Sequence, residues 1–294
     1  MRILLAGASG MIGTAVTHHA ESHELRRLVR REAAAEEYRW DPVRGVIPQE
    51  AIEWADAVIS LSGASLARIP WTRRYRRLIL RSRTETTSTL AAAIERATDP
   101  PSAWVSASAV GIYGDRPGEV LTEHSAPGTG FLADVVRAWE SAAAPATTAT
   151  RVVHARTGLV LAREGALKPL MLATRLGLGA RVGDGRQHWP WIALTDEARA
   201  LIHLATDSTL HGPVNLTSPE SSTSEEVTRE LAAALHRPHV FGLPRIALRA
   251  AMGLAADELL LSDQAAVPEA LLTEGFEFES PSLATAVRQV IASG

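Results

Sequence analysis

Short apolar runs alternate with amphipathic segments along most of the chain. The first run, Arg2–Ala6, ends in glycines, and the apolar residues of Met11–Ala20 then recur at helical spacing. Strands are predicted at Arg2–Ala6, Glu24–Arg30, Asp56–Leu61, Ala103–Ala107, Arg151–Leu161 and Gly212–Leu216. Helices are predicted at Met11–Ala20, Arg73–Ala97, Asp196–Ala205, Glu225–Leu235, Pro244–Gly253, Gln264–Glu274 and Leu283–Ala292.

This alternation is typical of an α/β fold with a Rossmann-type doubly wound parallel sheet, because parallel strands need a crossover between them. Residues 1–161, completed by about 191–217, would form the dinucleotide-binding unit. Residues 162–190 and 218–294 are glycine-rich or helical, and we expect a smaller, mostly helical lobe above the strand ends. Ligands of such folds bind in the crevice at the carboxyl ends of the strands.

The helix predicted at Glu225–Leu235 has local start and stop signals. Thr223 and Glu226 have the spacing of a capping box, in which each side chain bonds the backbone N–H of the other residue. Pro238 lacks an N–H and cannot continue a helix. We therefore expect this helix to begin and end close to these residues.

Composition excludes several classes of protein. Of the 294 residues 46% are hydrophobic, which is typical of globular proteins, and the net charge of −3 gives no general attraction to nucleic acid or membranes. Without cysteine, neither a disulfide framework nor thiolate chemistry is available. The apolar stretches are shorter than the roughly 18–20 residues of a spanning helix, and Met1 leads into a strand rather than a signal peptide. We expect a cytoplasmic protein.

The strongest motif is the glycine-rich segment Gly7–Gly13, between the first predicted strand and the first predicted helix. Its first glycine permits a tight turn, its second lets the backbone approach a pyrophosphate, and its third allows close packing of helix on strand. The helix N-terminus adds N–H groups and a positive dipole. A purely structural turn is the alternative, but the context favours a dinucleotide site. The predicted cofactor-binding residues are Gly7, Ser9, Gly10, Met11, Ile12 and Gly13.

The end of the second predicted strand indicates which dinucleotide binds. Proteins that prefer NAD usually carry Asp or Glu there for the ribose 2′-hydroxyl, whereas a 2′-phosphate needs cations. This chain has Arg30 and Arg31, and a guanidinium can hold phosphate through a forked, charge-assisted pair. Alternatively, both are solvated residues of an Arg-rich chain. The sequence predicts NADP(H) as the cofactor.

Further motifs lie along nearly the whole chain. They are Trp40–Pro42, Asp56–Gly63, Trp71–Thr72, Ser82–Arg83, Ser106–Asp115, Gly130–Ala133, Trp139–Glu140, Arg156–Gly158, Trp191–Ile192 and Gly212–Asn215. With the glycine-rich loop they resemble the extended short-chain dehydrogenase/reductase superfamily, and within it an atypical NAD-dependent epimerase/dehydratase-like branch of epimerase family proteins, sometimes called cell-division-inhibitor homologues. The stretch from about Leu243 to Ile291 resembles the domain of unknown function that ends members of this branch.

The resemblance implies further residues near the ligands. In this superfamily a turn of small residues after the strand at Asp56 passes close to the cofactor. The implied cofactor-binding residues are Leu61, Ser62, Gly63, Ser106 and Ala107. Ser65 would lie at the edge of the substrate site. Glu85 falls where many relatives carry Asn, and we place it with the substrate-binding residues.

A helical segment rich in arginine carries one more candidate. Its cations are Arg73, Arg74, Arg76, Arg77, Arg81 and Arg83. They could attract nucleic acid or an acidic partner, but their spacing spreads them around the helix with few aromatic residues between them, which favours a solvated face. Arg83 is the exception, and we predict that it binds at the cofactor or ligand site.

The catalytic set that the resemblance implies is incomplete. Ser108 falls where the superfamily has the Ser that hydrogen-bonds the reacting oxygen, and Tyr113 follows in Ile-Tyr-Gly. The Tyr-x-x-x-Lys pair expected about twenty residues later is absent, and that stretch has Phe131 and Val135 instead. If hydride transfer occurs, the proton must come from elsewhere, for example Tyr113, Asp134 or water. The branch shares this departure.

The substrate side of the crevice is predicted in the loop Gly183–Ile192, which mixes glycines with aromatic and polar residues. Gln187, Trp189 and Trp191 would line a partly apolar pocket, because aromatic rings with polar atoms suit such a ligand. The alternative is a structural loop anchored by its Trp residues, with an exposed His188.

Two functions remain, both with NADP(H) as the cofactor. The first is an oxidoreductase or epimerase acting on an unidentified small carbonyl or hydroxyl compound, with Ser108 positioning the substrate oxygen. The second, favoured by the missing Tyr and Lys, is a sensor or an assembly or cell-division-related factor that binds the dinucleotide without turnover. No metal is expected, since the histidines have no metal-ligand spacing. We expect a small-molecule substrate, no nucleic acid and no membrane partner, and a homodimer is left open.

Overall fold

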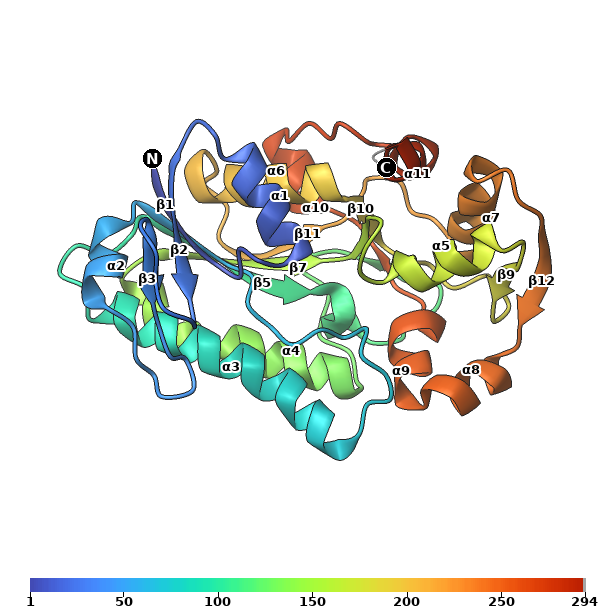
Figure 1. The fold of residues 1–294 in the computed structure, drawn as a ribbon, viewed down its shortest axis with the longest axis horizontal. Coiled ribbons are helices and arrows are strands. Elements are labelled where there is room, and N and C mark those ends of the chain that lie inside the picture. The colour runs from blue at the N-terminus through green and yellow to red at the C-terminus, as the bar shows by residue number, and fades with distance from the viewer. Residues whose placement is uncertain (293–294) are drawn as a thin grey trace.

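The computed structural model describes residues 1–292 and is built around a seven-stranded sheet in which all neighbouring strands are parallel (Figure 1). From edge to edge the strands are β11 (Gly212–Leu216), β7 (Arg151–Thr157), β5 (Ala103–Ala109), β4 (Ala57–Ser60), β1 (Arg2–Ala6), β2 (Glu24–Val29) and β3 (Glu37–Arg39). The chain adds β2 and β3 on one side of β1, then adds the remaining strands on the other side. The order therefore reverses between β1 and β4, which is where doubly wound sheets bind ligands. The predicted fold class is confirmed.

Alternate residues of the central strands face opposite layers of helices. In β1, Ile3 and Leu5 belong to one core cluster, whereas Leu4 and Ala6 belong to another on the opposite face. One face is covered by α1 (Met11–His19), α6 (Leu194–Thr206) and α10 (Glu269–Glu274). The other is covered by α2 (Gln49–Trp54), α3 (Arg73–Glu95) and α4 (Phe131–Ser141) (Figure 1). Strands buried on both faces explain the continuous apolar runs of the sequence.

A lobe of mostly helical elements lies at one end of the sheet (Figure 1). It contains α5 (Leu167–Arg175), β9 (Gly179–Val182), α7 (Ser224–Ala234), β12 (His239–Leu243), α8 (Arg245–Met252), α9 (Leu254–Ala256) and α11 (Leu283–Ala292). Its core includes Trp189, Leu231 and Val287, so it joins the middle of the chain to its C-terminal part. Two-stranded pairs complete the structure, namely β8 (Leu159–Leu161) with β10 (Trp191–Ala193), β9 with β12, and β6 (Val120–Leu121) with β13 (Ala265–Ala266). The exact boundaries of the two predicted units stay a prediction.

Two predicted elements are wrong in part. The strand predicted at Arg151–Leu161 divides at Gly158, where a Cβ would lie 2.3 Å from the carbonyl oxygen of Pro190, and its second half pairs outside the main sheet. The helix predicted at Gln264–Glu274 begins only at Glu269. The residue before a proline is disfavoured in helix, and Pro268 restricts the preceding segment, which forms β13 instead.

The start of α7 provides a test of local stability. Thr223 Oγ1 accepts from Glu226 N (3.3 Å), and Glu226 Oε2 accepts from Thr223 N (2.7 Å), so the predicted capping box is confirmed. Thr223→Ala removes one half of it and should lower the free energy of unfolding by about 1 kcal/mol. Urea denaturation measures this, with the exposed Thr209→Ala as the matched control. Equal midpoints for the two variants would show that the cap contributes nothing.

Candidate functional site

The phosphate loop Gly7–Gly13 joins β1 to α1 with very little side-chain volume between them. Gly7 has a φ of +90°, and a Cβ there would lie 2.9 Å from the carbonyl carbon of Leu61. A Cβ on Gly13 would lie 2.2 Å from Gly7 O, so α1 packs directly on the loop. Both positions therefore require glycine for steric reasons.

The second glycine of the loop serves a different purpose. A Cβ on Gly10 would have only Gly7 O near it, at an ordinary 3.5 Å, so this side of the loop is open. The N-cap residue of α1 is Gly10, which has no side chain to accept a hydrogen bond from the helix N–H groups. The first turn of α1 contains no acidic residue. The first N–H groups of α1 are thus not capped by a side chain, which fits a diphosphate at this helix end.

Gly10→Ala tests this fit. The extra methyl group meets no close protein contact, so the protein should fold with an unchanged melting temperature. The methyl group would stand where a diphosphate approaches the loop, and we expect the affinities for NADPH and NADH both to fall about tenfold or more, roughly 1.4 kcal/mol. Calorimetric titration gives both values. Unchanged affinities in a folded variant would place the dinucleotide elsewhere.

The two arginines after β2 have different environments. Arg31 Nη1 and Nη2 donate to Glu37 Oε2 and Oε1, both at 2.6 Å. The hydrogen bonds from Arg31 are the main reason that the pKa of Glu37 is lowered to about 2, and the N–H of Ala34 adds to the effect. Arg30 is exposed and has no ion-pair or hydrogen-bond partner within residues 1–292. Of the two predicted phosphate ligands, Arg30 is therefore the one whose guanidinium is free to bind.

The loop after β4 lies beside the phosphate loop, as the contact between Gly7 and Leu61 shows. Ser62 N would be 3.1 Å from a Cβ on Gly7, and Gly63 contacts the guanidinium of Arg83. The structure thus brings these predicted cofactor residues together. Ser65 lies farther along the loop, exposed, and its hydroxyl accepts from the backbone of the same loop.

Ser108 lies near the carboxyl end of β5, is 4% exposed, and hydrogen-bonds a largely buried ion pair. Its hydroxyl donates to Glu140 Oε1 (2.6 Å), and Arg156 Nε and Nη2 donate to both oxygens of Glu140 (2.9 and 3.0 Å). Burial alone would raise the pKa of Glu140, but the Arg156 pair and the Ser108 hydrogen bond outweigh it and lower the pKa. Because Glu140 is ionised, the hydroxyl hydrogen of Ser108 is used in the hydrogen bond to Glu140, and the hydroxyl oxygen is available as an acceptor.

Tyr113 does not fit the predicted catalytic role. It is 0% exposed, and its hydroxyl donates to Asn215 Oδ1 (2.7 Å) and accepts from Arg156 Nη1 (3.1 Å). Burial raises the pKa of Tyr113. Because this hydroxyl already donates to one protein group and accepts from another, we assign Tyr113 to the network that orients Arg156. Ser106, also predicted near the cofactor, is buried as well, whereas Ala107 is partly exposed.

A pocket of about 490 Å³ adjoins the phosphate loop on the side of the C-terminal lobe. Ser9, Met11 and Thr14 form one wall, Leu161–Glu164 a second, and 193–195 with residues of α11 the rest. A Cβ on Gly165 would lie 3.5 Å from Met11 Cε, so the segment after β8 folds over the start of α1. No sequence motif indicated that 161–164 would line a pocket. The segment follows the carboxyl end of a strand, which is where ligand crevices of such folds lie.

Comparison with known proteins assigns a family to this architecture. The model of the NAD dependent epimerase/dehydratase family matches residues 3–216, and an epimerase family protein of Mycobacterium leprae is 42% identical over 97% of this chain and 94% of its own. The chain belongs to the NAD dependent epimerase/dehydratase family. Residues 243–290 match a domain of unknown function (DUF1731), as the resemblance implied.

Solved structures of relatives have the same fold. The crystal structure of human epimerase family protein SDR39U1 (isoform 2) with NADPH superposes with a TM-score of 0.92 at 32% identity and covers 100% of both chains. A nucleoside-diphosphate sugar epimerase of Corynebacterium glutamicum gives 0.81 at 30% identity, over 99% of this chain and 58% of that one. The similarity to the human protein therefore includes the C-terminal lobe as well as the sheet.

This epimerase family member lacks the expected Tyr and Lys at the start of α4, and Asp134 in the first turn of the helix is paired with Arg137. Phe131 is the first residue of the helix, and Val135 one turn later is buried. The backbone N–H groups of Phe131 and Leu132 donate to the carboxylate of Glu258 (2.8 and 3.0 Å), so the C-terminal lobe caps this helix. The helix end therefore presents a phenyl ring and a bound carboxylate rather than a Tyr and a Lys.

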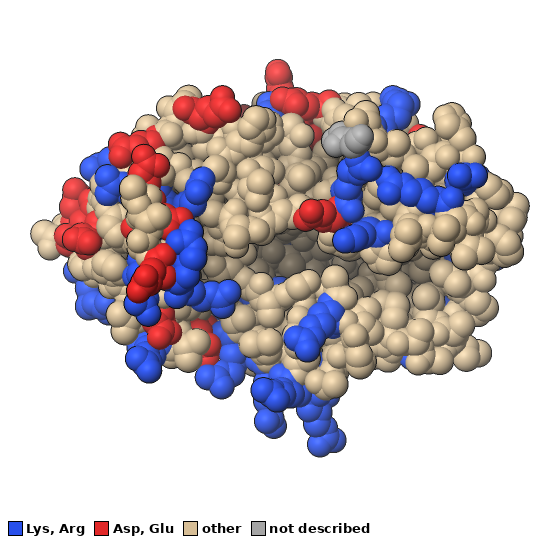
Figure 2. Space-filling view, in the orientation of Figure 1, with Lys and Arg blue, Asp and Glu red and all other residues tan. Residues whose placement is uncertain are grey.

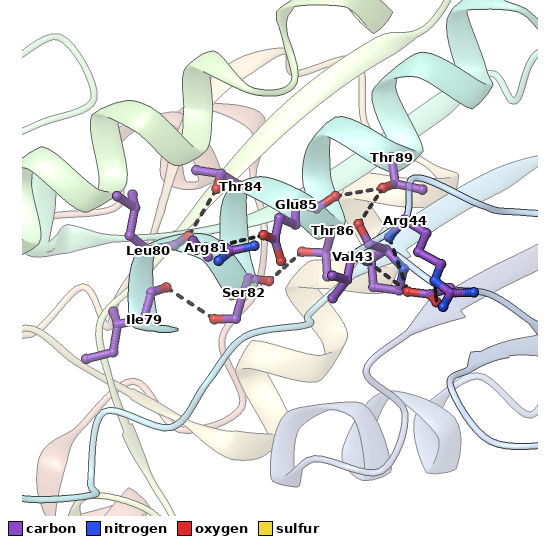
Figure 3. A network of polar contacts seen from close by, with 12 residues as sticks. Val43, Arg44, Ile79, Leu80, Arg81, Ser82, Thr84, Glu85, Thr86 and Thr89 are labelled. Atoms are coloured by element: carbon purple, nitrogen blue, oxygen red, sulfur yellow. Dashed lines mark hydrogen bonds and ion pairs between the residues drawn. The ribbon is translucent and has the colours of Figure 1, made fainter. Parts of the chain in front are cut away.

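Glu85 has a partner of its own on α3. Arg81 Nε donates to Glu85 Oε1 at 2.6 Å, one helical turn away (Figure 3). Thr86 and Thr89 on the same helix bond to backbone carbonyls, and Thr89 also reaches Pro42 O (Figure 3). This stretch of α3 therefore has an internal network, and within residues 1–292 Glu85 forms no hydrogen bond or ion pair with the other predicted substrate residues.

The loop predicted to line the substrate pocket is instead part of the core. Gln187 and Trp189 are 4% and 5% exposed, and both donate to Leu260 O (2.9 and 3.1 Å). Trp191 is fully buried and donates to Ser222 Oγ. His188 is partly exposed and bonds Asp263. These contacts favour the alternative of a Trp-anchored structural loop, because the side chains join the two halves of the C-terminal lobe.

Other kinds of site are not found in the part of the chain that the structure describes. Within residues 1–292, no group of three or more His, Asp or Glu side chains could hold a metal ion. No described helix is long and apolar enough to cross a membrane. Arg73, Arg74 and Arg77 are exposed at the start of α3, on a solvated face.

Proposed function

We propose that this protein binds NADP(H) and transfers hydride between the nicotinamide and a small carbonyl or hydroxyl compound. The observation that carries the proposal is the combination of an open, uncapped phosphate loop at Gly10 with the unpaired Arg30 after β2. The first fits a diphosphate and the second fits a 2′-phosphate. The human relative solved with NADPH supports the same cofactor.

Ser108 is the residue that we assign to the substrate oxygen. A bound nicotinamide would supply or accept the hydride, and the protein would have to position the oxygen and handle the proton. Because Ser108 donates to Glu140, its oxygen can accept a hydrogen bond from a substrate hydroxyl. Arg156 keeps Glu140 ionised and so fixes this orientation. The geometry therefore suits a substrate that presents a hydroxyl group.

A second candidate is a protein that binds NADP(H) as a structural or redox-state ligand without turnover. The observation that favours it is the start of α4, where Phe131 and Val135 stand in place of the expected Tyr and Lys and Asp134 is paired with Arg137. The burial of Tyr113 removes the nearest phenolic alternative. Such a protein would bind one redox form selectively.

One experiment separates the two candidates. Calorimetry first establishes NADPH and NADP⁺ affinities for the purified protein, and a panel of small alcohols and carbonyl compounds is then followed at the absorbance of NADPH. Substrate-dependent hydride transfer that is lost in Ser108→Ala, with cofactor affinity unchanged, supports the enzyme. Tight redox-selective binding with no transfer across the panel supports the second candidate, and no binding at all would overturn both.

A further inference from the structure

Arg83 lies where α3, α4 and the loop after β4 meet. Its Nη1 donates to the carbonyl oxygens of Ala64 (3.1 Å) and Ile79 (3.0 Å). Its Cζ lies 5.0 Å from the centre of the Trp139 ring, and a Cβ on Gly63 would lie 3.2 Å from the same carbon. The guanidinium is therefore held in one place by the backbone on one side and by an aromatic ring on the other.

The positive charge of Arg83 is not balanced by a carboxylate within residues 1–292. Other arginines around the sheet have such partners, for example Glu140 for Arg156 and Asp56 for Arg2. Burial lowers the pKa of Arg83 to about 10. A largely desolvated cation without a counter-charge costs folding free energy, and ionisable groups perturbed in this way are common at functional sites.

One edge of the Arg83 guanidinium is open. The N–H groups on Nε and Nη2 have no protein acceptor in the described chain, and neither atom is fully buried, so solvent reaches them. This edge is a fork of parallel N–H groups that matches two oxygens of one carboxylate or phosphate. Figure 2 shows a hollow between the sheet and the lobe, with Lys and Arg side chains around it and one Asp or Glu side chain at its rim.

The neighbours of Arg83 connect it to both parts of the candidate site. Gly63 follows the loop residues that contact Gly7, and Trp139 precedes Glu140, which holds Ser108. Arg83 therefore contacts the loop that continues from the phosphate-loop contact and the helix that carries the partner of Ser108. In the proposed function the start of α1 binds the diphosphate of the cofactor and Arg30 binds its 2′-phosphate. Arg83 is therefore available for an anion other than the cofactor.

We propose that Arg83 binds an oxyanion of the substrate, a carboxylate or a phosphate ester, and so holds the oxygen-bearing carbon of the substrate beside Ser108. This inference rests on the proposed function, because it assigns the substrate end of the same site. It narrows the substrate class to small anionic hydroxyl or carbonyl compounds.

The test uses full-length protein saturated with NADPH. Inorganic phosphate, succinate and the neutral analogue succinamide are titrated separately by calorimetry. We expect at least one of the two anions to bind and succinamide not to bind. In Arg83→Gln the anion affinity should fall tenfold or more, whereas Arg81→Gln, two residues away on the same helix, should match the wild type. Arg83→Lys keeps the charge but loses the fork, so it should restore phosphate binding better than succinate binding.

Stability and cofactor binding are measured in parallel. Arg83→Met keeps an apolar stem over Trp139 and removes the buried charge, so it provides a folded variant if Arg83→Gln is unstable. NADPH affinity should stay within twofold of the wild type in both variants. Anion binding that is absent from the wild type or unaffected in the variants would overturn the proposal. So would a tenfold loss of NADPH affinity, which would make Arg83 a cofactor residue. Failure of the wild type to bind NADPH would instead overturn the proposed function.

Discussion

Arg30→Ala is expected to weaken NADPH binding by about 10- to 150-fold and to leave NADH binding unchanged. The reason is that Arg30 is the free guanidinium after β2, whereas Arg31 has both terminal nitrogens bound to Glu37. A charged hydrogen bond contributes about 1.5–3 kcal/mol, which corresponds to that range of affinity. Calorimetric titrations with NADPH and NADH measure the ratio directly.

Arg31→Ala is the matched comparison. It removes a neighbouring arginine of the same charge, but one that is already paired, so its effect on NADPH affinity should be several-fold smaller. Equal losses of NADPH and NADH affinity in Arg30→Ala would show that Arg30 does not contact the 2′-phosphate. A larger loss in Arg31→Ala would mean that Arg31 leaves Glu37 when the cofactor binds.

Glu197→Gln is expected to make the protein more stable at alkaline pH. Glu197 is fully buried in the first turn of α6, and only one of its oxygens has a partner, the hydroxyl of Thr157 at 2.7 Å. Burial raises the pKa of Glu197 to about 8 from an ordinary 4.5. The folded state therefore keeps a proton that the unfolded state loses, so the stabilisation is complete below about pH 4.5 and disappears as the pH rises to about 8.

The size of this effect follows from the separation of the two pKa values. Between pH 5 and pH 8 the wild type should lose about 3 kcal/mol of unfolding free energy relative to Glu197→Gln, whose amide resembles the protonated acid. Chemical denaturation at several pH values measures the difference between the two proteins. The exposed Glu95→Gln should follow the wild type at every pH. A pH-independent difference for Glu197→Gln would show that the carboxylate is already ionised at pH 5.

Most of the fold could be predicted because local pattern and tertiary structure agree there. The strand Arg2–Ala6 was predicted with its observed ends, and the loop after it carries glycines that close packing requires at Gly7 and Gly13. Short strands such as Glu37–Arg39 were not predicted. A strand of this length is too short for a periodic pattern, and its sheet position is set by pairing with β2 rather than by its own sequence.

The candidate site was predictable only in part. Motifs in the sequence indicate Ser108 and the glycines. No motif indicates that the Ser108 hydroxyl donates to Glu140 or that Arg31 is paired with Glu37. The first pair depends on packing between residues 32 positions apart, and the second on the turn that brings β3 beside β2, and hydrogen bonds of about 3 Å decide the charge and accessibility of these groups. The same holds for Trp189 and Trp191, whose type suits a pocket as well as a core.

The sequence by itself determined the parallel α/β sheet, the phosphate loop and the family, because strand and helix periodicity and glycine sterics act over a few residues. Only the tertiary structure decided which polar groups are already paired. In the folded protein Tyr113, Gln187, Trp189 and Trp191 are buried and hydrogen-bonded to other protein groups. Arg30 and one edge of Arg83 have no protein partner within residues 1–292 and are available to a ligand. The physical reason is that burial and partnership belong to the folded arrangement of distant segments, which no local pattern specifies.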